Sequence, residues 1–136
     1  MRKQLYYHLA NTAAVSAVVG DRIYPQRVPT SDALPYIVFD ITSREVEYEQ
    51  DGYTTYNKLY VDISCCATTI AVCADLKNKV FTALNIQNTQ IGEAGDKQEV
   101  CRISLLSESD NYFLLDGSED GVREITQTYS INYMEA

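Results

Sequence analysis

The sequence has no tryptophan, only three phenylalanines and a single histidine, His8. It also lacks a Cys-x-x-Cys pair, a G-x-S-x-G or H-E-x-x-H motif, a phosphate-binding glycine loop and a dinucleotide-binding fingerprint. Those motifs supply the usual zinc ligands, nucleophiles and cofactor cradles of enzymes. Their absence predicts no catalytic, cofactor-binding or metal-binding residues, and we expect His8 to be structural.

Long apolar runs and an excess of bases are missing too. No window approaches the roughly 18 uncharged apolar residues of a membrane-spanning helix. The polar residues His8, Asn11 and Thr12 interrupt the first apolar stretch, so we expect no secretory signal. Only 11 Lys and Arg stand against 19 Asp and Glu, a net charge of −8. Because phosphate binding needs clustered bases, this balance argues against a surface that grips nucleic acid or anionic lipid.

What the sequence does contain fits one globular domain. Its 136 residues are 46% hydrophobic and 22% charged, so we assign residues 1–136 to a single domain. The 11 tyrosines combine apolar rings with polar tips, which suits half-buried strands and protein interfaces. We expect the four cysteines to be buried and reduced, as in a cytoplasmic protein: Cys65, Cys66, Cys73 and Cys101.

Two stretches have the periodicity of amphipathic helices. In residues 2–19 the apolar positions recur at four-residue spacing, and Gly20 follows as a left-handed C-terminal cap. Residues 69–84 repeat the pattern, with Thr68 or Thr69 as the N-cap. All three prolines lie in residues 21–35, which predicts an extended, turn-rich segment.

The remaining residues have either the apolar–polar alternation of strands or the composition of turns. Alternation predicts strands at 36–42, 53–66, 98–106, 111–115 and 124–133, with a loop and a short edge strand between 85 and 96. The first two strands form a hairpin with an acidic tip, and the polar residues 107–111 separate the third strand from the fourth. The predicted fold class is α+β: an antiparallel or mixed β-sheet with a long hairpin, packed against two α-helices on one face.

Three carboxylates occupy alternate positions on the acidic hairpin: Glu45, Glu47 and Glu49. On a strand this spacing places them on one face, where they can hold a divalent cation or act in acid–base chemistry. A small carboxylate-dependent enzyme is therefore one alternative. Since no other convergent group accompanies them, a solvated hairpin face is the other.

Charge is polarised along the chain. Residues 1–30 carry four bases against one acid, whereas residues 69–136 carry eleven acids against five bases. Complementary faces of this kind can steer head-to-tail copies of one subunit into a ring. Arg22 and Arg27 are the candidates for intersubunit ion pairs.

One block of sequence resembles a known family. The stretch Gly20-Asp-Arg-Ile-Tyr-Pro-Gln-Arg-Val-Pro29, followed by Leu34-Pro-Tyr-Ile-Val-Phe39, resembles the tail terminator or tail completion proteins of tailed bacteriophages, prophages and gene transfer agents. The Asp51-Gly52 turn, the strand Leu59-Tyr-Val-Asp-Ile63 and the helix end Val80-Phe-Thr-Ala-Leu84 resemble later family features. The chain departs from the family at Ser64-Cys65-Cys66, where an aromatic residue is common.

The resemblance implies a structural virion protein without enzymatic activity or cofactors. Such proteins form a ring, usually a hexamer, that caps the tail tube, stops its polymerisation and meets the head-side connector at the tail-neck junction. They assemble in the bacterial cytoplasm, and DNA passes the lumen without specific binding. A head–tail adaptor or other neck protein is the alternative. Our candidates for the interface with a second subunit or the tail tube are Arg22, Arg27, Glu45, Glu47, Tyr48, Glu49, Tyr53 and Tyr56.

Overall fold

The computed structural model describes residues 1–25, 34–48, 55–114 and 121–135, which form a mixed six-stranded sheet and three helices. The sheet has the order β1-β2-β3-β6-β5-β4, and only β1 and β2 run parallel. This is an α+β fold with a mixed sheet, as the sequence predicts. The elements are α1 (Arg2–Ala10), α2 (Ala13–Val19), β1 (Ile23–Pro25), β2 (Tyr36–Tyr48), β3 (Thr55–Ala67), α3 (Ile70–Leu84), β4 (Gln87–Ile91), β5 (Gln98–Leu114) and β6 (Gly121–Glu135).

Residues 2–19 form two helices, so the prediction of one continuous helix is wrong. The break falls where the Asn11 amide donates a hydrogen bond to the Tyr7 carbonyl, at 2.9 Å. The Thr12 hydroxyl donates to the His8 carbonyl at 2.7 Å. Side chains that bond the local backbone in this way compete with the helical hydrogen bonds and end the helix. The two helices still bury apolar residues in one core, with Leu5 and Leu9 from α1 and Val15 and Val19 from α2.

The other helix predictions are confirmed. The Thr69 hydroxyl accepts a hydrogen bond from the Val72 amide at 3.3 Å and so caps α3. Gly20 ends α2 as predicted, but its φ of 61° and ψ of −122° differ from those of the left-handed cap that was expected. Glycine adopts this conformation without steric cost. His8 Nε2 lies 2.7 Å from the Ala83 carbonyl oxygen, which joins α1 to the last turn of α3.

Two strands are longer than the sequence predicts. β2 continues through the acidic residues to Tyr48, paired with β3 along its length. β5 is one strand through residues 107–111, where a break was expected. The strict alternation of each strand is broken by a shift in register, between Ile41 and Ser43 in β2 and twice in β5. A bulge adds one residue to the strand, so the apolar and polar positions exchange faces beyond it. The sequence then no longer shows the continuous alternation that identifies a strand.

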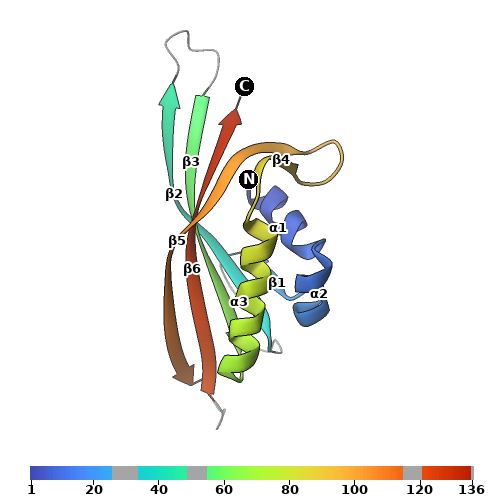
Figure 1. Ribbon diagram of the computed structural model, residues 1–136, viewed down its shortest axis with the longest axis vertical. Helices are drawn as coiled ribbons and strands as arrows, with labels where there is room; N and C mark the ends of the chain where they lie inside the picture. Colours follow the sequence, from blue (N-terminus) through green and yellow to red (C-terminus); the bar gives the residue numbers. More distant parts are fainter. Residues whose placement is uncertain (26–33, 49–54, 115–120, 136) are drawn as a thin grey trace.

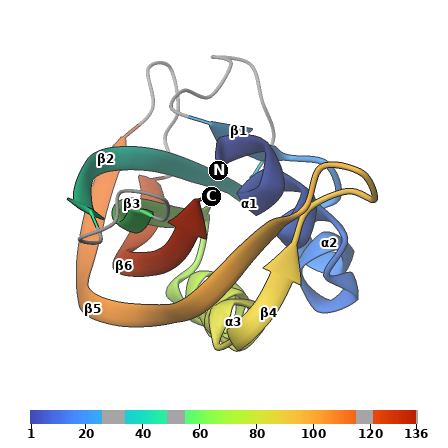
Figure 2. The ribbon, with the colours of Figure 1, turned by 90° about the horizontal axis from the view of Figure 1, so that it is seen from above.

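The sheet is long and strongly twisted, and the helices lie to one side of it (Figure 1). Seen along the long axis, β5 sweeps across to β4 beside α3, while β2 passes on the other side of β3 and β6 (Figure 2). The core fills the space between the sheet and the helices. Its largest fully buried side chains include Phe39, Ile63, Leu76, Tyr129 and Ile131. None of the helices in the described ranges is long and apolar enough to span a bilayer.

Candidate interaction surfaces

One face of the sheet is turned away from the helices, and it is polar over most of β3 and β6. In β3 and β6 the residues that alternate with the buried core positions are matched across the ladder, as Tyr60 with Ser130 and Asp62 with Thr128. We call this the helix-free face. Its positions on β3 and β6 are Lys58, Tyr60, Asp62, Ser64, Cys66, Glu124, Thr126, Thr128, Ser130 and Asn132.

Hydrogen bonds between side chains tie this face together. The Thr128 hydroxyl donates to Asp62 Oδ1 at 2.7 Å, and the Ser64 and Thr126 hydroxyls lie 2.9 Å apart. The Lys58 ammonium stands 5.7 Å from the centre of the Tyr60 ring. A hollow of about 360 Å³ opens at the upper end, and Glu45, Tyr56, Lys58, Cys101 and Asn132 contribute to its wall. From Lys58 to Ser64 of β3 and from Thr126 to Asn132 of β6 the face is therefore an ordered polar surface. Its far end is a small buried apolar cluster made of Tyr36, Cys66 and Val122.

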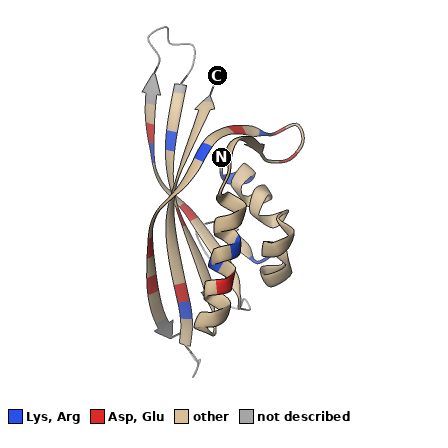
Figure 3. Cartoon of the chain, in the orientation of Figure 1, with Lys and Arg blue, Asp and Glu red and all other residues tan. Residues whose placement is uncertain are grey.

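Acids outnumber bases on the helix-free face. Where β2, β3, β6 and β5 are in register, its described charged side chains are the acids Asp40, Glu45, Asp62 and Glu124 and the bases Lys58 and Arg102. Figure 3 shows acidic and basic residues on both halves of the sheet. A surface of this sign repels the phosphates of nucleic acid.

The two outer long strands have uncovered edges. β1 pairs only with Ile37–Phe39 of β2, and β4 pairs only with residues 98–102 of β5. Within the described part of the chain, no strand pairs with the outer side of β2 from Asp40 to Tyr48 or of β5 from Ser104 to Leu114. We call these segments the β2 edge and the β5 edge. Figure 1 places the β2 edge on the upper left of the molecule and the β5 edge on the lower left.

The β5 edge begins beside a groove that polar and apolar side chains line together. Leu105 and Leu106 are 38% and 51% exposed, and Phe81 of α3 is 39% exposed. A groove of about 370 Å³ runs between α3 and β5, lined in part by Phe81, Ile103 and Leu105. Exposed leucines beside unpaired backbone are unusual, because strand edges are normally protected by charge, proline or cover.

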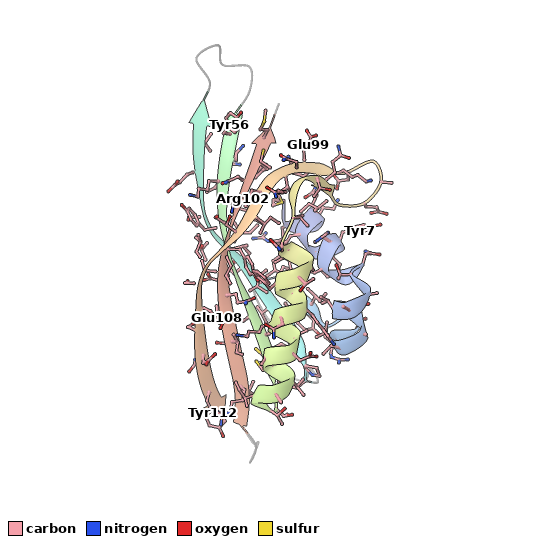
Figure 4. All side chains as sticks on the ribbon, viewed as in Figure 1. Tyr7, Tyr56, Glu99, Arg102, Glu108 and Tyr112 are labelled. Carbon is pink, nitrogen blue, oxygen red and sulfur yellow. The ribbon has the colours of Figure 1, made fainter. Side chains whose placement is uncertain are left out.

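A chain of hydrogen bonds leads from the core to the β5 edge. The buried Tyr129 hydroxyl donates to Gln127 Oε1 at 2.6 Å, and Gln127 Nε2 donates to Glu108 Oε1 at 2.9 Å. The Lys77 ammonium of α3 donates to the other carboxylate oxygen of Glu108 at 2.7 Å. The hydrogen bond from Lys77, with that from Gln127, lowers the pKa of Glu108, while burial raises the pKa of Tyr129. Figure 4 shows Glu108 and Tyr112 on the lower half of β5.

The interface residues predicted from the sequence lie in separate parts of the structure. Glu45 and Tyr56 are exposed, on β2 and β3 respectively, and Figure 4 shows Tyr56 at the upper end of the sheet. Glu47 and Tyr48 belong to β2, opposite Tyr56 and Thr55. Arg27, Glu49 and Tyr53 lie outside the described residues. Among the described residues, no three His, Cys, Asp or Glu side chains gather closely enough to hold a metal ion.

Arg22 is engaged within its own chain. Its Nε donates a hydrogen bond to the Pro35 carbonyl at 2.9 Å, and Nη2 donates to the Val18 carbonyl at 3.5 Å. The side chain is half-buried and joins the end of α2 to the start of β2. Sequence reasoning singled out Arg22 by charge alone and missed this structural contact.

The cysteine prediction is confirmed at three positions. Cys65, Cys66 and Cys73 are buried and unpaired with one another, while Cys101 is only partly buried. Burial raises the pKa of all three buried thiols, that of Cys66 to about 12. A thiol with a raised pKa is a poor nucleophile at neutral pH, so these residues are packing groups.

Sequence reasoning missed the β5 edge and the hydrogen-bond chain behind it. The available signal was the Leu105–Leu106 pair, since one of two adjacent apolar residues in a strand must face away from the core. The partners Lys77, Glu108 and Gln127 are brought together by the fold and carry no local signature.

Comparison with known proteins identifies a similar structure and a matching family. A chain from the virion of a native gene transfer agent particle has a similar structure, with a TM-score of 0.66 and 16% sequence identity over 96% of this chain and 92% of that chain. No curated protein sequence matches. The family described as Tail completion protein gp17 matches residues 3–111, from α1 into the lower half of β5. This match spans most of the chain, so the protein belongs to the Tail completion protein gp17 family.

Proposed function

We propose that this protein is a structural component of a phage or phage-like virion that caps the tail tube as a ring of identical subunits. The ring, a hexamer in this proposal, ends tail polymerisation and offers its other side to the head-side connector. Family membership supports a structural role in the tail and implies no enzymatic activity. The shared fold with a chain of a gene transfer agent virion supports a place in the particle.

The observation that carries the proposal is the helix-free face. A ring that DNA must cross needs a wall that is hydrated, ordered and not basic. The helix-free face has hydroxyls fixed by hydrogen bonds and more acids than bases. If it lines the channel, DNA passes without specific binding, because its phosphates meet a surface of like charge.

Ring closure requires two different contact surfaces on each subunit. The candidates on one side are the β2–β3 end of the sheet, with Glu45, Tyr48 and Tyr56, and on the other the basic N-terminal residues, with Arg22 and Arg27. Exposed tyrosine at Tyr56 suits an interface, since Tyr buries a large ring while keeping its hydroxyl hydrated. Arg22 can serve this role only through the part of its guanidinium that its own backbone contacts leave accessible.

Deletion of the gene from its phage or prophage tests the proposal. Loss of a tail terminator leaves tail tubes that overrun their set length, because nothing stops polymerisation. Electron microscopy of the lysate should show overlong tubes, and the wild-type gene supplied in trans should restore normal tails. Tails of normal length beside separate, filled heads would instead identify a head–tail adaptor and contradict the proposal.

A further inference from the structure

We propose that neighbouring subunits join by pairing the β5 edge of one copy with the β2 edge of the next, so that one sheet continues around the ring. This inference rests on the proposed ring and adds the surface that closes it. On both edges, residues 104–114 of β5 and residues 40–48 of β2, no other described strand pairs with the outer backbone. An edge of this length pairs readily with another strand unless something covers it.

The strand directions permit this pairing. From β2 through β3 and β6 to β5, every neighbouring pair is antiparallel, so β2 and β5 of one subunit run in opposite directions. In a ring all subunits have the same orientation along the axis. The β5 edge of one copy therefore meets the β2 edge of the next as an antiparallel pair, which forms without a special connection.

The offset between the two edges fits a closed barrel. Arg44 on β2, Leu59 on β3, Ile131 on β6 and Ile103 on β5 are aligned across the sheet. Glu108, near the middle of the β5 edge and on the same face as Arg44, lies four ladder steps further along β6, at Gln127 instead of Ile131. Four steps are about 14 Å along the strand, while the four strand spacings to the next β2 are about 19 Å. The ratio corresponds to a strand tilt of about 36°, within the roughly 35–45° at which sheets close into barrels.

Side chains on the two edges are complementary. On the side that bears the helices, the β2 edge carries Ile41, Arg44 and Val46, and the β5 edge carries Leu105, Glu108 and Asp110. Arg44 and Asp110 are exposed, and neither forms a salt bridge with another described residue. Residues directly opposite in an antiparallel pair share a face, so the register that fits sets Arg44 opposite Glu108. This pairing brings the guanidinium beside the two acids, and across the bulge of β5 it brings Val46 toward Leu105. Figure 3 shows acids but no bases on the lower half of β5.

Cross-linking of introduced cysteines tests the contact. In a Cys101→Ser background, Arg44→Cys is made in one preparation, and Leu105→Cys, Glu108→Cys and Asp110→Cys, on the same face of the sheet, are made separately in others. The preparations are mixed in the presence of tail tubes and treated with a short bis-maleimide. In a parallel sample, electron microscopy counts the rings that the wild-type protein forms on the tubes. The three remaining native thiols are buried and should not react. We expect a covalent dimer from Arg44→Cys with at least one β5 variant, and none from any variant alone.

Glu99→Cys is the matched control, because Glu99 is exposed on β5 but pairs with β4. It should not cross-link to Arg44→Cys. Rings without any Arg44–β5 cross-link would overturn this inference and leave the proposed function standing. Failure of the wild-type chain to form rings on tubes would overturn both.

Charge exchange provides a second readout. Arg44→Glu should raise the midpoint concentration for ring formation about tenfold, because an acid then faces Glu108 and Asp110. Asp110→Arg added to Arg44→Glu should restore it, whereas Glu93→Lys, on an exposed loop, should leave it unchanged. Unaltered assembly of the Arg44→Glu protein would contradict the pairing.

Discussion

Lys77 Nζ of α3 lies 2.7 Å from Glu108 Oε2 of β5, on the segment of β5 that no described strand flanks on its outer side. The same carboxylate accepts a hydrogen bond from Gln127, so β5, β6 and α3 meet at one residue. Since β4 ends well before this point, Glu108 is the polar contact that holds the β5 edge to the helical layer.

Replacing Glu108 with Gln should lower the free energy of unfolding by about 1 kcal/mol at neutral pH, because a charged hydrogen bond becomes neutral at a partly exposed site. The folded pKa of Glu108 lies below its ordinary value of 4.5. The stabilisation is therefore complete above the unfolded pKa and is lost as pH falls through the folded pKa. Urea unfolding at several pH values should show the difference between the two proteins vanishing in acid. Glu93→Gln, on an exposed loop, should match wild type throughout.

Maleimide labelling should distinguish the cysteines. In the native protein Cys101 should react fastest, since it is the only partly exposed thiol of the four. Cys65, Cys66 and Cys73 should react only on unfolding, because burial both shields them and raises the pKa of each thiol. Mass spectrometry of labelled peptides in the presence and absence of urea measures this, and rapid native labelling of Cys73 would contradict it.

Gly92 should tolerate no side chain. Its φ is 118°, and a Cβ there would lie 2.7 Å from the Asp96 carbonyl oxygen and 2.9 Å from Gln4 Cγ. Gly92→Ala should therefore cost about 1–3 kcal/mol of stability, measured by thermal unfolding. Gly95→Ala is the control with positive φ but no atom within 4 Å, and it should cost less. Equal costs at both positions would show that the close contacts are irrelevant.

Arg22→Glu should destabilise the isolated subunit as well as any ring. The substitution removes the hydrogen bond to the Pro35 carbonyl, and the half-buried backbone group loses its partner at a cost of about 1–3 kcal/mol. Thermal unfolding at a concentration too low for assembly measures this effect. A weakened ring with unchanged subunit stability would instead favour the intersubunit ion pair.

Local signals predicted those elements that local bonds determine. Thr69 correctly predicted the start of α3, and the alternation around Leu59 and Val61 identified the buried face of β3. The break at Thr12 was missed because threonine is a neutral residue within a helix until its hydroxyl turns back to the His8 carbonyl. The amino-acid sequence around Thr12 does not indicate whether its hydroxyl will bond the backbone in this way.

The polar part of β5 could not be predicted for a different reason. Residues 107–111 resemble a loop, yet they pair with residues 124–128 of β6. Only the partner strand makes such a sequence extended, and β-propensity depends on that context. The two uncovered edges follow from the shortness of β1 and β4, a property of the whole sheet that no single residue encodes.

The order of the strands also determines when this subunit can fold. β3 and β6 are adjacent at the centre of the sheet, yet Thr55 pairs with Glu135, 80 residues away. During synthesis, β3 leaves the ribosome long before β6 has been translated. Until then one side of β3 is unpaired, even if the helices and the β2–β3 ladder have formed. Closing so large a loop is slow, because its entropy is lost before the ladder forms. The central sheet is therefore completed only after translation has passed Glu135, and no subunit is ready for assembly before then.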